Sequence, residues 1–163
     1  MKDLKNSLIL CGDFTMNKIE WCLRQKKGIT LIERNENLAK DYVQKSEEAL
    51  ESMAQLQNIN WKSITGYYAC YNMLFSLLMK CGIKCEIHEC SLELMKLFSS
   101  FDEEDVVFIK KLKDKRIDVQ YYLKDAESLD EEAIKSFVLK CKKIIIEIKD
   151  DEINDIRKKL KND

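Results

Sequence analysis

Residues 64–81, ITGYYACYNMLFSLLMKC, form the most apolar stretch of the chain and decide its fold class. Apolar or aromatic side chains fall on nearly every face of a helix drawn through these residues, so neighbours must cover that helix on several sides. The stretch contains no proline, and Gly82 follows it as a C-terminal stop. The sequence therefore predicts a central helix around which the other elements pack.

The residues before this helix carry two shorter apolar patterns. Apolar side chains recur at helical spacing over 36–57, and Asn35 stands directly before them as a predicted N-cap. Residues 16–26 predict a short leading helix. Gly28 interrupts the pattern between the two helices, so residues 28–35 are predicted to form an irregular link.

Three further helices are predicted after the central one. A short helix opens at Cys90 or Ser91, where apolar residues begin to repeat every third or fourth position. Asp102 is the predicted N-cap of a helix over 103–123. The last helix starts after residues 128–130 and has a long apolar face.

The C-terminal part of the chain combines two patterns. The run CKKIIIEI at 141–148 is rich in β-branched residues, as strands are. Helical apolar spacing nevertheless continues over 133–148, well beyond the length of a typical strand, so we favour a helix. Residues 150–163 are highly charged and predict a helical tail that frays.

These elements together predict an all-α fold, an up-and-down bundle of about five helices joined by short loops. No repeat, low-complexity segment or Gly/Ser-rich linker divides the sequence. We therefore expect one domain over residues 1–163 with its core at 36–149. Residues 1–35 form an N-terminal extension with a short helix, and 150–163 form the charged tail.

The composition excludes several classes of protein. The 28 Lys and Arg residues nearly cancel the 29 Asp and Glu residues, so there is no overall basic field for nucleic acid, although a local basic patch is compatible with this balance. No run reaches the roughly 18 apolar residues of a membrane span, and the apolar run at 8–11 is too short for a signal peptide. Seven cysteines, an odd number, lack the spacing of a disulfide framework. We expect a cytoplasmic protein in a reducing compartment, without membrane association or cofactor.

The segment CGIKCEIHEC, residues 81–90, gathers three cysteines and the only histidine of the chain. Zinc requires four ligands that converge tetrahedrally, commonly from two pairs separated along the chain. Cys81, Cys85, His88 and Cys90 lie in one run with no second arm, and the last two point apart in a helix or a strand. A metal site and a Cys–His nucleophile stay as alternatives. The favoured interpretation is that Cys81 and Cys85 are buried packing residues at a helix connection, and that His88 caps or packs the next helix.

Two segments together resemble the HEPN-domain family. Residues 61–98, WKSITGYYACYNMLFSLLMKCGIKCEIHECSLELMKLF, combine an aromatic and small-residue helix, a Gly-containing loop, a His and a shorter apolar helix. Residues 112–125, LKDKRIDVQYYLKD, resemble the second signature of the family, an Arg inside a helix followed by a polar, Tyr-rich turn. The order and spacing of these features match over 36–149. The resemblance implies an up-and-down helical bundle that is usually a homodimer.

The resemblance also implies a site. Many HEPN proteins are metal-independent ribonucleases in which an Arg holds the phosphate and a His, four to six intervening residues later, transfers protons. Arg116 matches the Arg, but residues 121–123 contain no His, and tyrosine with a pKa of about 10 is a poor replacement. The resemblance therefore implies a nucleotide or RNA contact at Arg116, in a groove lined by Tyr121, Tyr122 and Lys115.

Simpler interpretations stand beside this one. Arg116 could instead be a surface arginine paired with Asp118 or a neighbouring acid. Tyr67, Tyr68 and Tyr71 belong to the central helix, and Tyr67 and Tyr71 fall on one face of it. They are predicted to be core or dimer-interface residues rather than a platform for stacking bases.

Three functions stay open. The first is a nucleotide-binding or RNA-associated interaction module. Small HEPN proteins of this form are often paired with a minimal nucleotidyltransferase as a proposed toxin–antitoxin pair, and the transferase can modify a tyrosine near the motif, here Tyr121 or Tyr122. The second is an active ribonuclease toxin that uses Arg116 with a different proton donor. The third is a purely structural helical adaptor.

Overall fold

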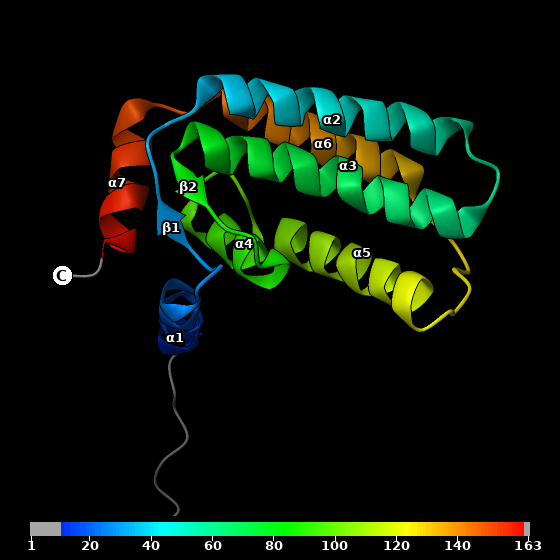
Figure 1. Ribbon diagram of the computed structural model, residues 1–163, viewed down its shortest axis with the longest axis horizontal. Helices are drawn as coiled ribbons and strands as arrows, with labels where there is room; N and C mark the ends of the chain where they lie inside the picture. The colour runs from blue at the N-terminus through cyan, green and yellow to red at the C-terminus, as the bar shows by residue number, and fades with distance from the viewer. Residues whose placement is uncertain (1–10, 162–163) are drawn as a thin grey trace, which may run out of the picture.

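The structure, a computed structural model, describes residues 11–161, with side chains from residue 18 onward (Figure 1). The all-α prediction is confirmed, and α2 to α6 supply the five helices of the predicted bundle. The helices in the described range are α1 (Cys11–Arg24), α2 (Glu36–Gln55), α3 (Ile59–Lys80), α4 (His88–Leu94), α5 (Glu103–Tyr121), α6 (Glu131–Glu147) and α7 (Asp150–Leu160). The described range also contains two short strands, β1 (Thr30–Leu31) and β2 (Ile83–Lys84), and a 3-10 helix, η1 (Met95–Leu97).

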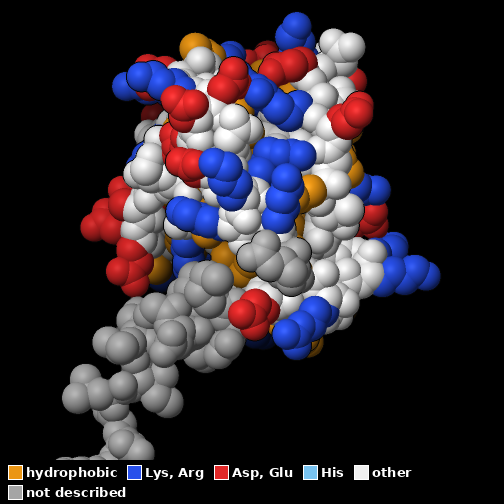
Figure 2. Space-filling model, turned by 90° about the vertical axis from the view of Figure 1, so that its left-hand side faces the viewer, with side chains coloured by type: hydrophobic (Ala, Val, Ile, Leu, Met, Phe, Trp, Pro, Cys, Tyr) orange, Lys and Arg blue, Asp and Glu red, His pale blue; other side chains and the backbone are white. Residues whose placement is uncertain are grey.

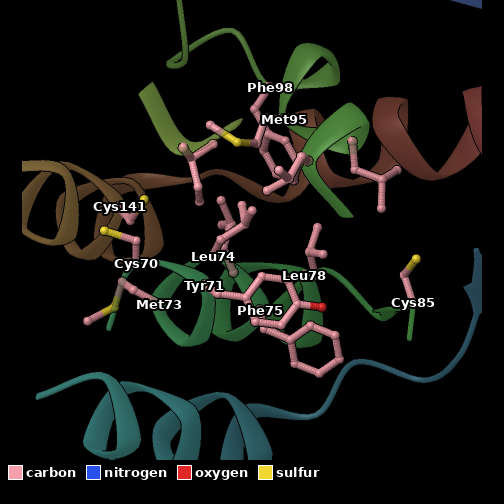
Figure 3. Packing of buried hydrophobic residues seen from close by; sticks show 14 of the residues in the cluster. Cys70, Tyr71, Met73, Leu74, Phe75, Leu78, Cys85, Met95, Phe98 and Cys141 are labelled. Atoms are coloured by element: carbon pink, nitrogen blue, oxygen red, sulfur yellow. The ribbon is translucent and has the colours of Figure 1, made fainter. Parts of the chain in front are cut away.

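Helix α3 is the central helix, as predicted. It packs against α2, α5 and α6, which lie around it on different sides (Figure 1). Leu74 and Leu78 are fully buried and point toward Met95 and Phe98, whereas Phe75 points toward α2 (Figure 3). Because these side chains leave α3 in several directions, one helix holds together the layers on either side of it.

The predicted capping residues set the helix boundaries. The Asn35 side chain accepts a hydrogen bond from a backbone N–H of the first turn of α2 at 2.9 Å. Asp102 and Asp105 each accept a hydrogen bond from the other's backbone N–H at 2.9 Å, which forms a capping box at the start of α5. Gly82 adopts a φ of 68° directly after α3, the left-handed conformation that ends many helices.

The link between α1 and α2 is not wholly irregular, because it contains β1. This strand pairs antiparallel with β2, with Thr30 opposite Lys84 and Leu31 opposite Ile83. The partner strand follows α3 and is distant in the sequence. A local apolar pattern gives no sign of such a pairing, and the prediction of an irregular link over 28–35 is wrong at these two residues.

The C-terminal segment is a separate, packed helix. Residues 148–149 are not helical and separate α6 from α7. Ile153, Ile156 and Leu160 of α7 are buried in the hydrophobic core. Their i, i+3, i+7 spacing forms one apolar face, which outweighs the charged composition of the segment. The predicted helical tail is present as a separate helix, and its buried side chains belong to a core that extends beyond 36–149.

Two arginines attach this end of the molecule to α3. Arg157 donates hydrogen bonds to the carbonyl oxygens of Ile32, Cys81 and Gly82 at 2.7 to 3.0 Å. Arg34 donates to the carbonyl of the last residue of α3 at 3.0 Å. Both cations therefore lie at the negative end of the α3 dipole. Lys and Arg side chains gather in the middle of this end of the molecule, with Asp and Glu around them (Figure 2).

The other boundaries differ from the predicted ones by a few residues. Helix α4 begins at His88 instead of Cys90 or Ser91, and α5 ends at Tyr121. The run at 141–148 is helical up to Glu147, as favoured. Within the described residues no helix is both long and apolar enough to cross a bilayer. Most of the apolar run at 8–11, the first part of the N-terminal extension and the last two residues of the tail lie outside the described range.

Candidate functional site

Helix α5 places Arg116 against the tyrosines of α3. The guanidinium Cζ lies 5.6 Å from the centre of the Tyr67 ring and 5.2 Å from that of Tyr68. The Tyr121 ring, at the end of α5, lies 5.3 Å away. Nη2 of Arg116 donates a hydrogen bond to Tyr68 Oη at 2.6 Å. Arg116 is only 9% exposed, so aromatic faces replace much of the water around its charge.

Arg116 is a buried cation that forms no ion pair with any carboxylate of residues 18–161. Asp118, the partner that a surface arginine would have, pairs instead with Lys124 at 2.9 Å. The Nε of Arg116 is buried and has no hydrogen-bond partner in the same range. The surface-arginine alternative is therefore wrong. Burying a charge is costly unless it is paired, so this guanidinium has unused capacity to bind an anion.

His88, the first residue of α4, completes the cluster. Its ring stacks on Tyr71 with the centroids 4.0 Å apart, and its Nδ1 lies 2.7 Å from Tyr67 Oη. The Tyr68 ring meets the His88 ring edge-on at 6.5 Å. Histidine and arginine thus share Tyr67 and Tyr68 as neighbours. We name the following residues the aromatic–arginine cluster: Tyr67, Tyr68, Tyr71, His88, Arg116 and Tyr121.

The surroundings set the protonation states of the cluster. Burial, together with the positive charges of Arg116 and Lys113, lowers the pKa of His88 below its usual value. Burial raises the pKa of Tyr67 and raises that of Tyr71 to about 12. At neutral pH the imidazole is therefore uncharged, and both phenols keep their protons. Arg116 is then the charged member of the cluster.

The structure brings together two of the four predicted binding residues. Arg116 and Tyr121 lie in the cluster, where Tyr121 is 63% exposed beside the buried guanidinium. Tyr122 lies instead against Lys124, whose Nζ is 5.6 Å from the ring centre. Lys115 donates to a backbone carbonyl of the loop between α5 and α6 at 2.5 Å. The side chains of Tyr122 and Lys115 thus contact residues of the loop between α5 and α6.

Three members of the cluster, Tyr67, Tyr68 and Tyr71, were not predicted as site residues, and His88 was considered only with the neighbouring cysteines or as a packing residue. Tyr67 and Tyr71 are buried, as expected of core residues, and their rings stack on one face of α3 at 5.7 Å. Sequence reasoning missed that their neighbour Tyr68 contacts both Arg116 and His88. The available signal was a tyrosine-rich helix followed closely by the only histidine. The position of this histidine relative to Arg116 depends on how α5 packs against α3 and α4. No local sequence pattern reveals that packing.

The cysteine and histidine segment does not assemble into a metal site. Cys90 forms a disulfide with Cys22, which the sequence did not predict. Cys81 and Cys85 are buried free cysteines, as the packing interpretation proposed, and burial raises the pKa of both thiols. His88 packs on α3. Across the part of the chain that the structure describes, no three His, Cys, Asp or Glu side chains are arranged to hold a metal ion.

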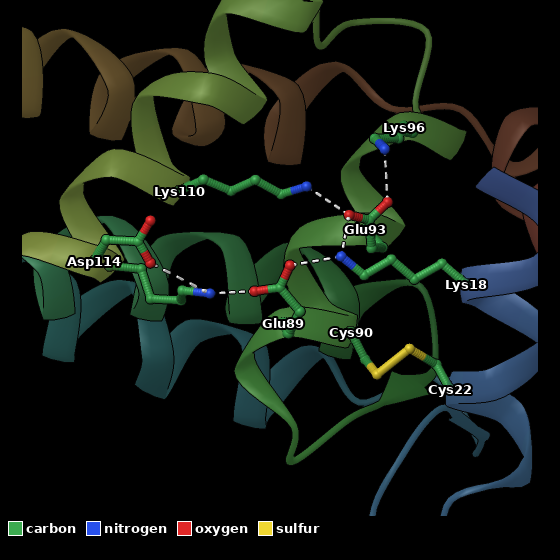
Figure 4. Close-up of polar contacts among 9 residues, drawn as sticks. Lys18, Cys22, Glu89, Cys90, Glu93, Lys96, Lys110 and Asp114 are labelled. Carbon is green, nitrogen blue, oxygen red and sulfur yellow. Dashed lines mark hydrogen bonds and ion pairs between the residues drawn. A yellow bond between two sulfur atoms is a disulfide. The ribbon is translucent and has the colours of Figure 1, made fainter. Parts of the chain in front are cut away.

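Glu93 of α4 is a second buried charge, and three lysines lie against its carboxylate. Its carboxylate lies 2.5 Å from Lys110 Nζ, 2.7 Å from Lys96 Nζ and 3.1 Å from Lys18 Nζ (Figure 4). Burial raises the pKa of Glu93, but the hydrogen bonds from these lysines outweigh burial and hold it at about 2. The network joins α1, η1 and α5 to α4, and the contrast with the unpaired Arg116 favours Arg116 as the ligand contact.

Comparison with known proteins adds no assignment. No protein-family model, curated protein or solved structure matches the chain. The resemblance to the HEPN family therefore stays a prediction from the sequence, and the function must be inferred from the cluster itself.

Proposed function

We propose that the aromatic–arginine cluster binds a phosphate-bearing ligand, a nucleotide or RNA, in a HEPN-type interaction module. The observation that carries this proposal is Arg116, a buried guanidinium without a carboxylate partner in the described residues. A phosphate would supply the missing negative charge and accept hydrogen bonds from the planar guanidinium. The exposed ring of Tyr121 beside it offers a face on which a base can stack.

Calorimetric titration of the purified protein with AMP, ATP and a short single-stranded RNA tests the proposal. We expect saturable binding that Arg116→Gln weakens about 10- to 100-fold, because a hydrogen bond to a charged group contributes about 1.5–3 kcal/mol. Lys115→Gln is the matched control, since it removes the same charge from the adjacent residue, whose side chain contacts the loop. Equal losses in both variants, or no binding by the unaltered protein, would contradict the proposal.

The partner proposals rest on the resemblance alone. A homodimer, and a pairing with a minimal nucleotidyltransferase as toxin and antitoxin, would both suit a cytoplasmic nucleotide-binding module. Light scattering during size-exclusion chromatography measures the first, and a neighbouring nucleotidyltransferase gene supports the second. A monomer that binds neither nucleotide nor RNA, and has no such neighbour, would instead be a structural adaptor.

A second candidate function, a ribonuclease, is favoured by the position of His88. The imidazole shares Tyr67 and Tyr68 with Arg116 and is neutral at pH 7. If Nδ1 donates its proton to Tyr67 Oη, then Nε2 keeps a free lone pair, which is the form that a general base needs. Arg116 would then hold the phosphate next to a base that comes from a different helix, instead of from the linear motif.

Incubation of the protein with RNA distinguishes the two candidates. An active ribonuclease should lose activity about 100- to 10,000-fold in His88→Gln, the range expected for removal of a general acid or base. Arg116→Gln should lose both cleavage and binding. Binding that depends on Arg116 without cleavage that depends on His88 would leave the interaction module as the function.

A further inference from the structure

The disulfide between Cys22 and Cys90 attaches α1 to α4 (Figure 4). Both cysteines are fully buried, and 68 positions separate them in the sequence. Among the described residues, α4 is the main packing partner of α1. Ile19 of α1 is buried in the core, and Lys18 reaches two carboxylates of α4 at 2.7 and 3.1 Å.

The other restraints on α1 are weak. The helix has 14 residues, a length at which an isolated helix is only marginally stable in water. Ion pairs of a partly exposed lysine contribute little, because water screens them and the side chain loses rotamer freedom. The covalent bond is therefore the strongest connection that keeps α1 on α4.

The same short helix carries both the disulfide and the imidazole of the cluster. Helix α4 has seven residues, with His88 first and Cys90 third. The position of His88 on Tyr71 therefore depends on how firmly α4 is held, and one of its attachments is the Cys22–Cys90 bond.

We propose that the Cys22–Cys90 disulfide is a redox-sensitive latch that controls the docking of α1 and the position of His88. When α1 opens locally, a thiolate of a dithiol or of glutathione attacks one sulfur, the S–S bond breaks, and a mixed disulfide forms. A second thiolate then displaces the protein sulfur. Two electrons and two protons pass to Cys22 and Cys90, and the reductant leaves as its own disulfide.

Two considerations favour this pair as the redox-active one. Among the cysteines whose side chains the structure describes, Cys22 and Cys90 are joined by a disulfide, whereas Cys70, Cys81, Cys85 and Cys141 are free. Disulfides in a reducing compartment, which the composition predicts for this chain, are usually transient and redox-sensing rather than permanent. This inference concerns the attachment of α1 and holds whether or not the cluster binds phosphate.

Peptide mapping and hydrogen exchange test the latch. Protein purified without reductant should yield a cross-linked peptide that contains Cys22 and Cys90. Reduction with a dithiol should then speed amide exchange at 18–24 and 88–94 at least about 10-fold, while α2 and α6 stay protected. Free thiols at both positions after mild oxidation, or unchanged exchange after reduction, would overturn the proposal.

The only histidine of the chain provides a second readout. Stacking on Tyr71 should shift the ring protons of His88 upfield in the NMR spectrum, and reduction should move them toward unstacked values. Cys22→Ser should show the reduced spectrum under all conditions, whereas Cys85→Ser should respond to reductant like the unaltered protein. If Cys22→Ser does not fold, reduction of the native protein still decides the question, and unmoved His88 signals would refute the latch.

Discussion

Arg116 illustrates how one buried charge can lower the stability of a fold. Its charge is 9% exposed, and no described carboxylate compensates it. Three aromatic rings recover part of the lost hydration, since cation–π contacts are stronger away from water. A side chain of this kind is expected where binding has been favoured over stability.

Replacement of Arg116 by methionine should separate the two effects. Arg116→Met keeps an unbranched chain against the tyrosine rings but removes the buried charge. We expect the free energy of unfolding to rise by about 1 kcal/mol, because apolar replacements of buried charges are often stabilising. Urea denaturation measures it. A loss of more than about 1 kcal/mol would mean that Arg116 mainly supports the fold.

Gly82 is a position at which a single added methyl group should lower stability. Its φ of 68° disfavours any other residue, and a Cβ there would lie 2.6 Å from the Ile32 carbonyl oxygen. We expect Gly82→Ala to lower the free energy of unfolding by about 2–3 kcal/mol, from the left-handed backbone and the overlap together. Ser100→Ala, in an exposed turn, is a control that should change it by less than about 0.5 kcal/mol.

At the scale of elements, the C-terminus of α5 has an unusual residue. Leu123 adopts a φ of 53° and is 87% exposed, one position after the C-cap Tyr122. The following N–H, of Lys124, donates to the Asp118 carbonyl at 3.1 Å, as in a helix end that normally carries glycine.

We expect Leu123→Gly to raise the free energy of unfolding by up to about 1 kcal/mol, because glycine adopts this conformation without the steric cost of a Cβ. Thermal denaturation followed by circular dichroism measures the change. Leu139→Gly is the opposite control, since it places glycine inside α6 at another exposed leucine and should destabilise by about 1 kcal/mol. An equal loss in both variants would mean that the backbone at 123 is not strained.

The elements that sequence could predict are those with local causes. The apolar period of α2 and the caps Asn35 and Asp102 involve residues within one or two turns. The missed features join distant positions. His88 meets Tyr67 across 21 positions, and Arg116 meets Tyr68 across 48. Such contacts depend on how whole helices pack, so the sequence did not show that His88 and Arg116 share tyrosine neighbours.

At the scale of the molecule, Glu93 links four elements through its lysines. Its pKa of about 2 lies below the ordinary value of 4.5. The ionised carboxylate therefore stabilises the fold at pH values above 4.5. This contribution is lost as the pH falls from about 4.5 toward 2. The shift corresponds to about 3 kcal/mol.

Glu93→Gln tests this linkage. We expect the variant to be less stable than the unaltered protein at pH 7 by about 3 kcal/mol. Its free energy of unfolding should also fall less than that of the unaltered protein between pH 4.5 and 2. Denaturant titrations across that pH range measure both effects. Glu127→Gln, in the exposed loop before α6, should behave like the unaltered protein. An unchanged pH profile for Glu93→Gln would mean that the ion pairs are not formed in solution.

The contact of Arg157 with Ile32 spans 125 positions and sets an order on biosynthesis. While the chain emerges from the ribosome, α2 and α3 can pair as soon as both are exposed. The carbonyls of Cys81 and Gly82, however, stay hydrated until α7 has been made and can deliver its arginine. A nascent chain that stalls before α7 would therefore have no arginine bound to the carbonyls at the C-terminal end of α3. Chaperones and proteases could recognise this exposed end.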